Sequence, residues 1–228
     1  MTGSDEDDRG YASPPCFMHE LDPACAGLVT NAKQEADVKR WRKAERERLI
    51  AARLGLSSDT RRTYGDRIVE ALRELIGNPA GIVVSAYWPF RGEPDLRGLF
   101  EEVDAGGGRG ALRIVVERGR PLIFRTWGKG EPLERGVWNI PVPAGGEEVV
   151  PDIVISPVVG FDPSCYRLGY GGGFFDRTLA ALPKRPRVLG VGYALQAIPT
   201  IYPQPHDIPM DVVVTEEGVV TPVKRPAD

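Results

Sequence analysis

The chain has 228 residues, 42% of them hydrophobic, and a formal net charge of −3. This length and composition suit one globular domain with a tail. The slight acidic excess gives no electrostatic case for binding nucleic acid, and no run of about 18 apolar residues predicts a membrane span.

The first 35 residues are predicted to form an N-terminal extension that is partly disordered. They begin MTGSDEDDRG, which is acidic and lacks an apolar signal core. A passive leader and an arm that covers the site or a second subunit both stay open. Cys16, Cys25 and Cys165 fit a reducing compartment, so we expect a cytoplasmic protein. The two histidines, His19 and His206, are too few and too scattered for a zinc site.

Two helices are expected next. Asp37 is a candidate N-cap for a helix over 36–54, and Ser57 or Ser58 for a second helix that Gly77 ends. The apolar residues of both segments fall near helical spacing: Val38, Trp41, Leu49 and Ala52 in the first, and Tyr64, Ile68, Leu72 and Leu75 in the second. The basic run KRWRKAERER is interrupted by glutamates, which favours a solvated helix face.

Short β-branched runs then alternate with helical segments. Asp95 is expected to cap a short helix, and the glycine-rich stretch 106–110 to form a loop. The expected strands cover 82–87, 112–116, 122–126, 153–156, 188–192 and 211–215. This alternation predicts an α/β fold in three layers, α/β/α, with a mostly parallel central sheet in a single domain over 36–220 and a C-terminal tail at 221–228.

The segment FDPSCYRLGYGGGFFDR, at 161–177, carries the strongest functional signal. Its glycines allow positive φ and close approach of the backbone to a ligand. The helix expected after them directs its free N–H groups at an anion, and Arg167 adds a cation. The spacing matches neither a Walker loop nor a dinucleotide fingerprint. A phosphate-binding loop and a plain glycine-rich turn are the two interpretations that remain.

The same block, together with WNIPVP at 138–143, DIVIS at 152–156 and PHDIPMDVVVTEEG at 205–218, resembles the 5-formyltetrahydrofolate cyclo-ligase family. Its members are also called 5,10-methenyltetrahydrofolate synthetases. The resemblance spans roughly residues 36–220, and the RLGYGGG block with its two aromatics, Asp and Arg is the specific part. It implies an enzyme that uses ATP and Mg²⁺ on 5-formyltetrahydrofolate. The formyl oxygen attacks the γ-phosphate, N10 closes the ring, and ADP and phosphate are released with 5,10-methenyltetrahydrofolate.

The resemblance also implies roles for individual residues. The ATP-binding set is Lys39, Arg42, Arg167, Gly169, Tyr170, Gly171, Gly172, Gly173, Phe174 and Phe175, with Arg167 also catalytic. The folate-binding set is Glu93, Trp138, Tyr170 and Phe174, and the Mg²⁺ ligands are Asp176 and Asp207. A strict match for the lysine falls on Val38, one residue before Lys39.

Each role has a structural alternative. Arg167 can instead form an ion pair with a carboxylate, and Asp176 can cap the helix after the glycines. Glu93 can be a surface-loop carboxylate and Trp138 a core residue. His206 is expected to be a loop or core histidine rather than a catalyst.

Three positions depart from the commonest family pattern. Cys165 stands where the family often has Gly, and we expect it to fill a small space in the core rather than to react. Phe174 and Phe175 stand where many members have Tyr-Tyr. Apolar stacking survives that change, but a hydroxyl hydrogen bond does not. A non-catalytic, regulatory paralogue that binds folate or nucleotide is therefore the alternative function. We expect a monomer or small homo-oligomer without membrane or nucleic-acid partners.

Overall fold

A computed structural model describes residues 32–223, so Cys16, Cys25 and His19 lie outside the described residues, as does most of the predicted N-terminal extension. The helices are α1 Ala32–Leu54, α2 Ser58–Ile76, α3 Arg97–Ala105 and α4 Phe174–Ala181, with 3₁₀ turns η3 Val137–Asn139 and η4 Ala194–Gln196. The strands are β1 Val83–Ala86, β2 Arg109–Ile114, β3 Ile123–Thr126, β4 Leu133–Arg135, β5 Pro141–Pro143, β6 Ile153–Pro157, β7 Gly160–Phe161, β8 Arg167–Leu168, β9 Arg187–Val191, β10 Val212–Thr215 and β11 Gly218–Val220.

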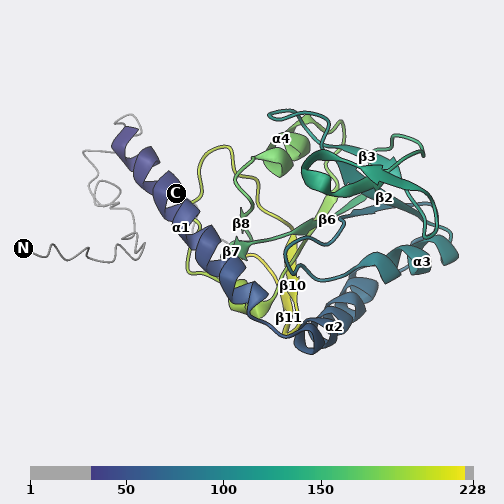
Figure 1. The fold of residues 1–228 in the computed structure, drawn as a ribbon, viewed down its shortest axis with the longest axis horizontal. Helices are drawn as coiled ribbons and strands as arrows, with labels where there is room; N and C mark the ends of the chain where they lie inside the picture. Colours follow the sequence, from purple (N-terminus) through teal and green to yellow (C-terminus); the bar gives the residue numbers. More distant parts are fainter. Residues whose placement is uncertain (1–31, 224–228) are drawn as a thin grey trace, which may run out of the picture.

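The main sheet has seven strands in the order β11-β10-β9-β6-β1-β2-β3. The five inner strands run parallel, and only the two edge strands, β3 and β11, pair antiparallel with their neighbours. Helices α2 and α3 lie along one face of this sheet and α4 lies on the other (Figure 1). The predicted α/β/α architecture with a mostly parallel sheet in a single domain is therefore confirmed.

Strand β6 shows why the central strands are apolar throughout. Ile153 and Ile155 point into the core beneath α2 and α3, where they join Ile68. Val154, between them, packs on the opposite face in a cluster that includes Phe175 of α4. Side chains of a strand alternate between faces, so a strand covered on both sides reads as a continuous hydrophobic run.

The second helix forms as its caps predict. Ser57 is the N-cap, and its hydroxyl accepts the N–H of Thr60 at 3.0 Å. Gly77 ends the helix with a φ of 66°, a conformation that favours glycine. Ile68 and Leu72 are fully buried, as the helical spacing predicts.

Two predicted boundaries were wrong. Leu96, not Asp95, is the N-cap of α3, although the Asp95 carboxylate still accepts the N–H of Arg97 at 3.1 Å. The predicted loop 106–110 ends early, because Arg109 begins β2 and pairs with β1. Glycine is required at 110, since a Cβ there would lie 2.4 Å from the Phe100 ring of α3.

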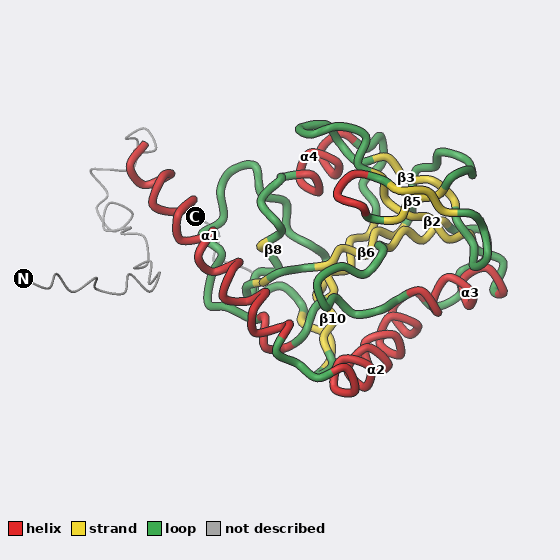
Figure 2. The backbone as a smooth tube through the Cα atoms, viewed as in Figure 1, coloured by secondary structure: helices red, strands yellow, loops and turns green. Residues whose placement is uncertain are grey.

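Helix α1 lies apart from the other three helices, beside the loops that carry the predicted site (Figure 2). It begins at Ala32, earlier than predicted. Val38 and Leu49 are buried, but Ala52, which was expected to face inward, is exposed. Trp41 packs edge-on against Tyr202, with ring centroids 4.8 Å apart. No helix within the described span 32–223 is long and apolar enough to cross a bilayer.

The strand order reverses between β1 and β6, and this reversal positions the site. The chain leaves β1 toward β2 on one side and leaves β6 toward β9 on the other. Such a switch point opens a crevice at the carboxyl ends of the two strands, where α/β sheets bind ligands. The loop after β1 carries Glu93, and the segment after β6 leads into the glycine block at 169–173.

Candidate active site

The glycine block is held between a small hairpin and a helix. Strands β7 and β8 pair antiparallel, and α4 starts directly after Gly173. Gly171 and Gly173 have φ values of 91° and 63°, which favour glycine. A Cβ at Gly172 would lie 2.6 Å from the Phe174 ring. The loop therefore needs glycine at all three positions to take this shape.

Backbone donors of this loop are available to a ligand. The N–H groups of Gly171, Gly172 and Gly173 donate no hydrogen bond within residues 32–223. Gly171 and Gly172 are exposed, and the N-terminus of α4 follows them. Free N–H groups at the start of a helix are suited to bind a phosphate oxygen.

Arg167 is buried beneath the loop and faces Asp176, the first-turn acidic residue of α4. Its Nη2 lies 2.9 Å from Asp176 Oδ1, so the ion pair named as the structural alternative is present. The contact is close but poorly aligned, and Nη2 keeps no hydrogen-bond acceptor among the described residues. Its Nη1 donates only a long bond of 3.4 Å to the Ile208 carbonyl. Burial lowers the pKa of Arg167, and the charge of Asp176 opposes that shift. Arg167 thus retains donors for an anion.

Helix α1 contributes two arginines on one face. Arg42 donates to Asp207 at 2.5 Å and to the carbonyls of Ile201 and Tyr202, which fixes the loop before β10. Arg46, one turn later, donates from Nε to the Gly169 carbonyl at 2.6 Å. Burial and the charge of Arg42 lower the pKa of Arg46. Two guanidinium groups this close favour the presence of an anion.

Lys39 does not share this position. Its side chain is exposed, and no contact joins it to the glycine block in the described part of the chain. Arg46, which the sequence analysis did not assign to the site, is the residue of this basic run that bonds the glycine block, and the role of Lys39 stays a prediction. A run of charged residues does not show which side chains the fold will bury. The sequence analysis therefore predicted that Arg46 belongs to a solvated helix face.

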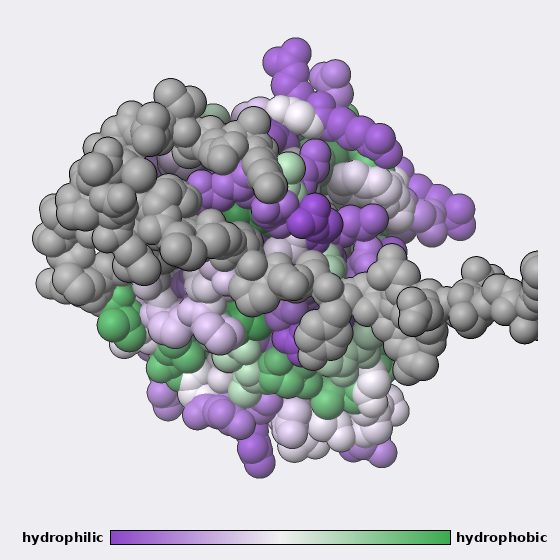
Figure 3. Space-filling model, turned by 90° about the vertical axis from the view of Figure 1, so that its left-hand side faces the viewer, coloured by the Kyte–Doolittle hydropathy of each residue, from purple (hydrophilic) through white to green (hydrophobic). Residues whose placement is uncertain are grey.

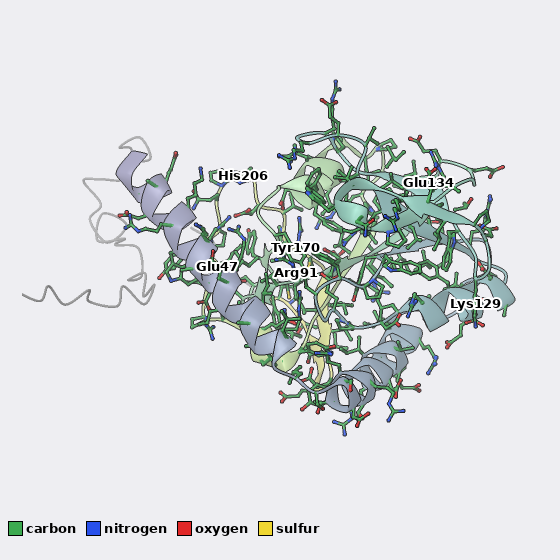
Figure 4. The ribbon with its side chains drawn as sticks, viewed as in Figure 1. Glu47, Arg91, Lys129, Glu134, Tyr170 and His206 are labelled. Carbon is green, nitrogen blue, oxygen red and sulfur yellow. The ribbon has the colours of Figure 1, made fainter. Side chains whose placement is uncertain are left out.

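Glu93 is buried rather than a surface carboxylate. Its Oε2 accepts the N–H of Phe90 at 3.0 Å, and its Oε1 accepts the hydroxyl of Tyr170 at 2.9 Å. Arg53, which is 0% exposed, donates to that same hydroxyl at 2.7 Å and to the Arg91 carbonyl at 2.9 Å. Tyr170 and Arg91 lie between α1 and the sheet, at the centre of Figure 4. This network joins α1, the loop after β1 and the glycine block.

The charge of Glu93 depends on its neighbours. Burial raises the pKa of Glu93, while Arg113, Arg53 and the Tyr170 hydroxyl act in the opposite direction. Residue Glu93 also borders an open groove of about 1010 Å³ between α2 and α3, which the glycine block does not line. A buried carboxylate with two cations near it is suited to accept N–H groups from a ligand.

Aromatic side chains surround the start of α4. Trp138 is 50% exposed and meets the Phe174 ring edge-on, with centroids 5.7 Å apart. Its φ of 57° is unusual for a bulky residue and typical of functional loops. Trp138 is therefore not a core residue. The Phe175 ring lies under two guanidinium groups, with Arg167 at 4.9 Å and Arg113 at 5.1 Å from its centroid.

Asp176 contacts the loop that carries Asp207. Asp176 Oδ1 accepts the N–H of Ile208, the residue after Asp207. The described residues contain no group of three or more acidic, His or Cys side chains around one point. Mg²⁺ commonly binds through one or two carboxylates and completes its shell with water and phosphate oxygens. The two aspartates fit such an ion only if it arrives with a phosphate ligand.

Two further residues of the region, Cys165 and His206, carry reactive side chains. Cys165 is buried, and burial raises the pKa of its thiol to about 11. Its φ of 60° is a conformation that glycine adopts more easily than cysteine does. His206 is exposed, and its Nε2 lies 3.8 Å from Asp207 (Figure 4).

Three arginines at the site were missed from the sequence: Arg46, Arg53 and Arg113. The surface on the α1 side, where grey atoms do not hide it, is hydrophilic toward the top and carries hydrophobic patches lower down (Figure 3). The cations of the site lie between α1 and the sheet rather than in a surface stripe. Their burial depends on how α1 docks, which no sequence period shows.

These features define a doubly wound α/β protein with a candidate anion-binding site at the switch point of its sheet. Residues 38–216 match the sequence model of the 5-formyltetrahydrofolate cyclo-ligase family. The chain belongs to this family.

Individual relatives agree with this assignment. The chain is 32% identical over 163 residues to the 5-formyltetrahydrofolate cyclo-ligase of Mycolicibacterium smegmatis, covering 66% of this chain and 84% of that protein. It is 32% identical over 145 residues to the Escherichia coli protein of the same name, covering 60% and 79%. The solved structure of Aquifex aeolicus 5,10-methenyltetrahydrofolate synthetase superimposes with a TM-score of 0.69 at 29% identity, covering 82% of this chain and 96% of that one.

Proposed function

We propose that this protein converts 5-formyltetrahydrofolate to 5,10-methenyltetrahydrofolate, with ATP consumed to ADP and a phosphate that carries away the formyl oxygen. The observation that carries the proposal is the arrangement of arginines around the glycine block. Arg46 bonds the Gly169 carbonyl. Arg167, on β8 just before the block, pairs with Asp176 just after it, and Arg42 pairs with Asp207. Tyr170 of the same block bonds the buried Glu93. This reaction needs two parts: cations that bind a polyanion, and a carboxylate that accepts hydrogen bonds from a neutral, N–H-rich ring. Family membership and the relatives' names support the same substrates.

The phosphates of ATP would bind to the glycine N–H groups and the arginines. The N–H groups of Gly171 to Gly173 have no acceptor within the described residues, and Arg46 and Arg167 retain unused donors. Donors fixed before the ligand arrives stabilise developing charge without reorganisation. Lys39, being exposed, has at most a minor part in this site.

Two ion pairs hold the arginines and the carboxylates of the site together. Arg42 pairs with Asp207 and Arg167 with Asp176, and all four side chains are at least partly buried. A phosphate that takes the arginine donors would free both carboxylates for Mg²⁺. The bound ion would supply positive charge to the phosphate oxygens.

The folate ring would bind on the other side of the glycine block. Glu93 is expected to accept pterin N–H groups, since a carboxylate can receive two parallel bonds. Tyr170, already bonded to Glu93, holds the carboxylate in place. Trp138 and Phe174 offer ring faces and edges for stacking, and their contact survives without the tyrosines common in relatives.

With both substrates bound, the formyl oxygen would lie between the ring site and the phosphate site. Attack of this oxygen on the γ-phosphorus forms an O–P bond and releases ADP. N10 then attacks the formyl carbon and loses its proton, and the C–O bond breaks as phosphate leaves. The protein's part is to align a weak nucleophile and neutralise the phosphoryl oxygens.

The test is absorbance of the methenyl product, measured with purified protein, 5-formyltetrahydrofolate, Mg²⁺ and ATP. We expect a rise that requires all four, with one ADP formed per methenyl group. A flat trace from folded protein that still binds ATP would refute the proposal and favour the non-catalytic paralogue.

A further inference from the structure

Arg113 is a cation at the site to which the sequence analysis gave no role. It is the next-to-last residue of β2, so its side chain stands at the carboxyl end of the sheet. Leu112 pairs with Ala86 in the parallel register, which places Arg113 beside Tyr87. Since α/β sheets bind ligands at this edge, Arg113 lies where a substrate is expected.

The guanidinium of Arg113 contacts rings and lacks a hydrogen-bond acceptor. Its Cζ lies 5.4 Å from the Tyr87 ring centroid and 5.1 Å from that of Phe175. Its side chain makes no hydrogen bond or ion pair within residues 32–223, only the two ring contacts. Glu93 is close enough to influence its charge, but the carboxylate is already bonded to Phe90 and Tyr170. Burial lowers the pKa of Arg113 and Glu93 opposes the shift. Arg113 is half-buried, and none of its nitrogens is among the fully buried atoms without a partner, so its N–H groups remain open to an acceptor from a ligand.

The position of Arg113 lies between the two halves of the proposed site. Arg167, on the phosphate side, contacts the same Phe175 ring at 4.9 Å. Glu93, on the folate side, is the charged group whose influence on Arg113 is largest. The rings of Tyr87 and Phe175 orient the guanidinium, and a planar fork of donors matches two phosphoryl oxygens.

We propose that Arg113 binds the phosphoryl group as it passes from ATP to the formyl oxygen, and so acts as a second arginine of the transfer step beside Arg167. This inference rests on the proposed cyclo-ligase function. Charge on a transferred phosphoryl group spreads over its three equatorial oxygens, and a cation placed at the point of transfer stabilises that state more than it stabilises bound ATP. Arg113 therefore affects turnover more than nucleotide affinity.

The experiment compares Arg113→Met and Arg113→Lys with wild type. Methionine keeps the apolar contact with both rings, and lysine keeps the charge but loses the fork. Arg109→Met is the matched control, because Arg109 is on the same strand but exposed and paired with Glu147. The readouts are kcat, the KM of each substrate, ATP affinity by calorimetry, and thermal unfolding.

We expect Arg113→Met to lower kcat by about 100-fold or more while ATP affinity changes by less than about threefold. Arg113→Lys should recover about a tenth of the wild-type kcat, and Arg109→Met should behave as wild type. If Arg113→Met does not fold, Arg113→Lys decides the question, and a wild-type kcat in it overturns the inference. A change confined to the folate KM also overturns it, because it assigns Arg113 to folate alone. Absence of turnover in the wild type is a different result, which refutes the proposed function itself.

Discussion

Replacing Glu93 by glutamine tests the folate half of the site with a change of one charge and almost no change of shape. In the structure both carboxylate oxygens accept hydrogen bonds, one from the Phe90 N–H and one from the Tyr170 hydroxyl. A glutamine can satisfy the Phe90 N–H with its oxygen. Its NH₂ group then faces Tyr170, whose hydroxyl must accept a bond instead of donating one.

The variant should weaken folate binding without unfolding the protein. A hydrogen bond to a charged group is worth about 1.5–3 kcal/mol, and the pterin would lose at least one such bond. At about 1.4 kcal/mol per tenfold change, the folate KM should rise by about one to two powers of ten. The ATP KM should change by less than about threefold, because Glu93 forms no bond to Arg42, Arg46 or Arg167.

The assay is initial-rate formation of the methenyl product with each substrate varied in turn. Asp95→Asn provides the control, since Asp95 lies in the same loop but is exposed and paired with Arg97. An unchanged folate KM in Glu93→Gln, or an equal rise in both KM values, would refute the assignment of Glu93 to the pterin.

Three further outcomes are expected. Arg167→Ala should reduce kcat/KM by about 2–4 kcal/mol of transition-state stabilisation, and wild-type kinetics would remove Arg167 from the phosphate site. Tyr170→Phe should raise the folate KM by about 2- to 12-fold. It also removes a bond that lowers the pKa of Glu93, so that pKa should rise in the variant. Folate binding needs the ionised carboxylate and is lost as the pH falls through this pKa, so the variant should lose folate affinity at a higher pH than wild type. Coincident pH profiles of the two proteins would contradict this. Cys165, buried and with its thiol pKa raised to about 11, should resist alkylation at neutral pH in the native protein and react after denaturation, as peptide mass spectrometry would show.

The elements that could be predicted from the sequence are those with a strong local period. Ile68 and Leu72 lie at helical spacing on α2, and the apolar run of β6 is long enough to identify a buried strand. The strands that were missed, β4, β5, β7, β8 and β11, have two or three residues each, too few to show a period of two. Strand β2 was shifted because Gly110 suggests a loop, although close packing of Phe100 requires glycine there.

The residues of the candidate site also divide into those that the sequence could predict and those that it could not. The glycine block could be found because its composition is itself the requirement, as the φ values of Gly171 and Gly173 show. Arg53 and Arg113 could not, because a single arginine in a helix or strand is ordinary until the fold buries it. Lys39 and Arg46 lie in the same basic run, and only the docking of α1 against the Gly169 carbonyl separates the exposed residue from the buried one.

Helix α1 is therefore a part of the site rather than a cover over it. Arg42 fixes the loop that carries Asp207, Arg46 holds the carbonyl of Gly169, and Arg53 bonds the Tyr170 hydroxyl that reaches Glu93. The three arginines bind the glycine block and the loops beside it through hydrogen bonds in which the donor is charged, and such bonds are the stronger kind. The phosphate and folate sites consequently share one support, and loosening α1 would disturb both. A substitution that weakens the binding of only one substrate must therefore leave these three bonds intact. We expect such substitutions at residues such as Glu93 or Trp138, which contact α1 only indirectly or not at all.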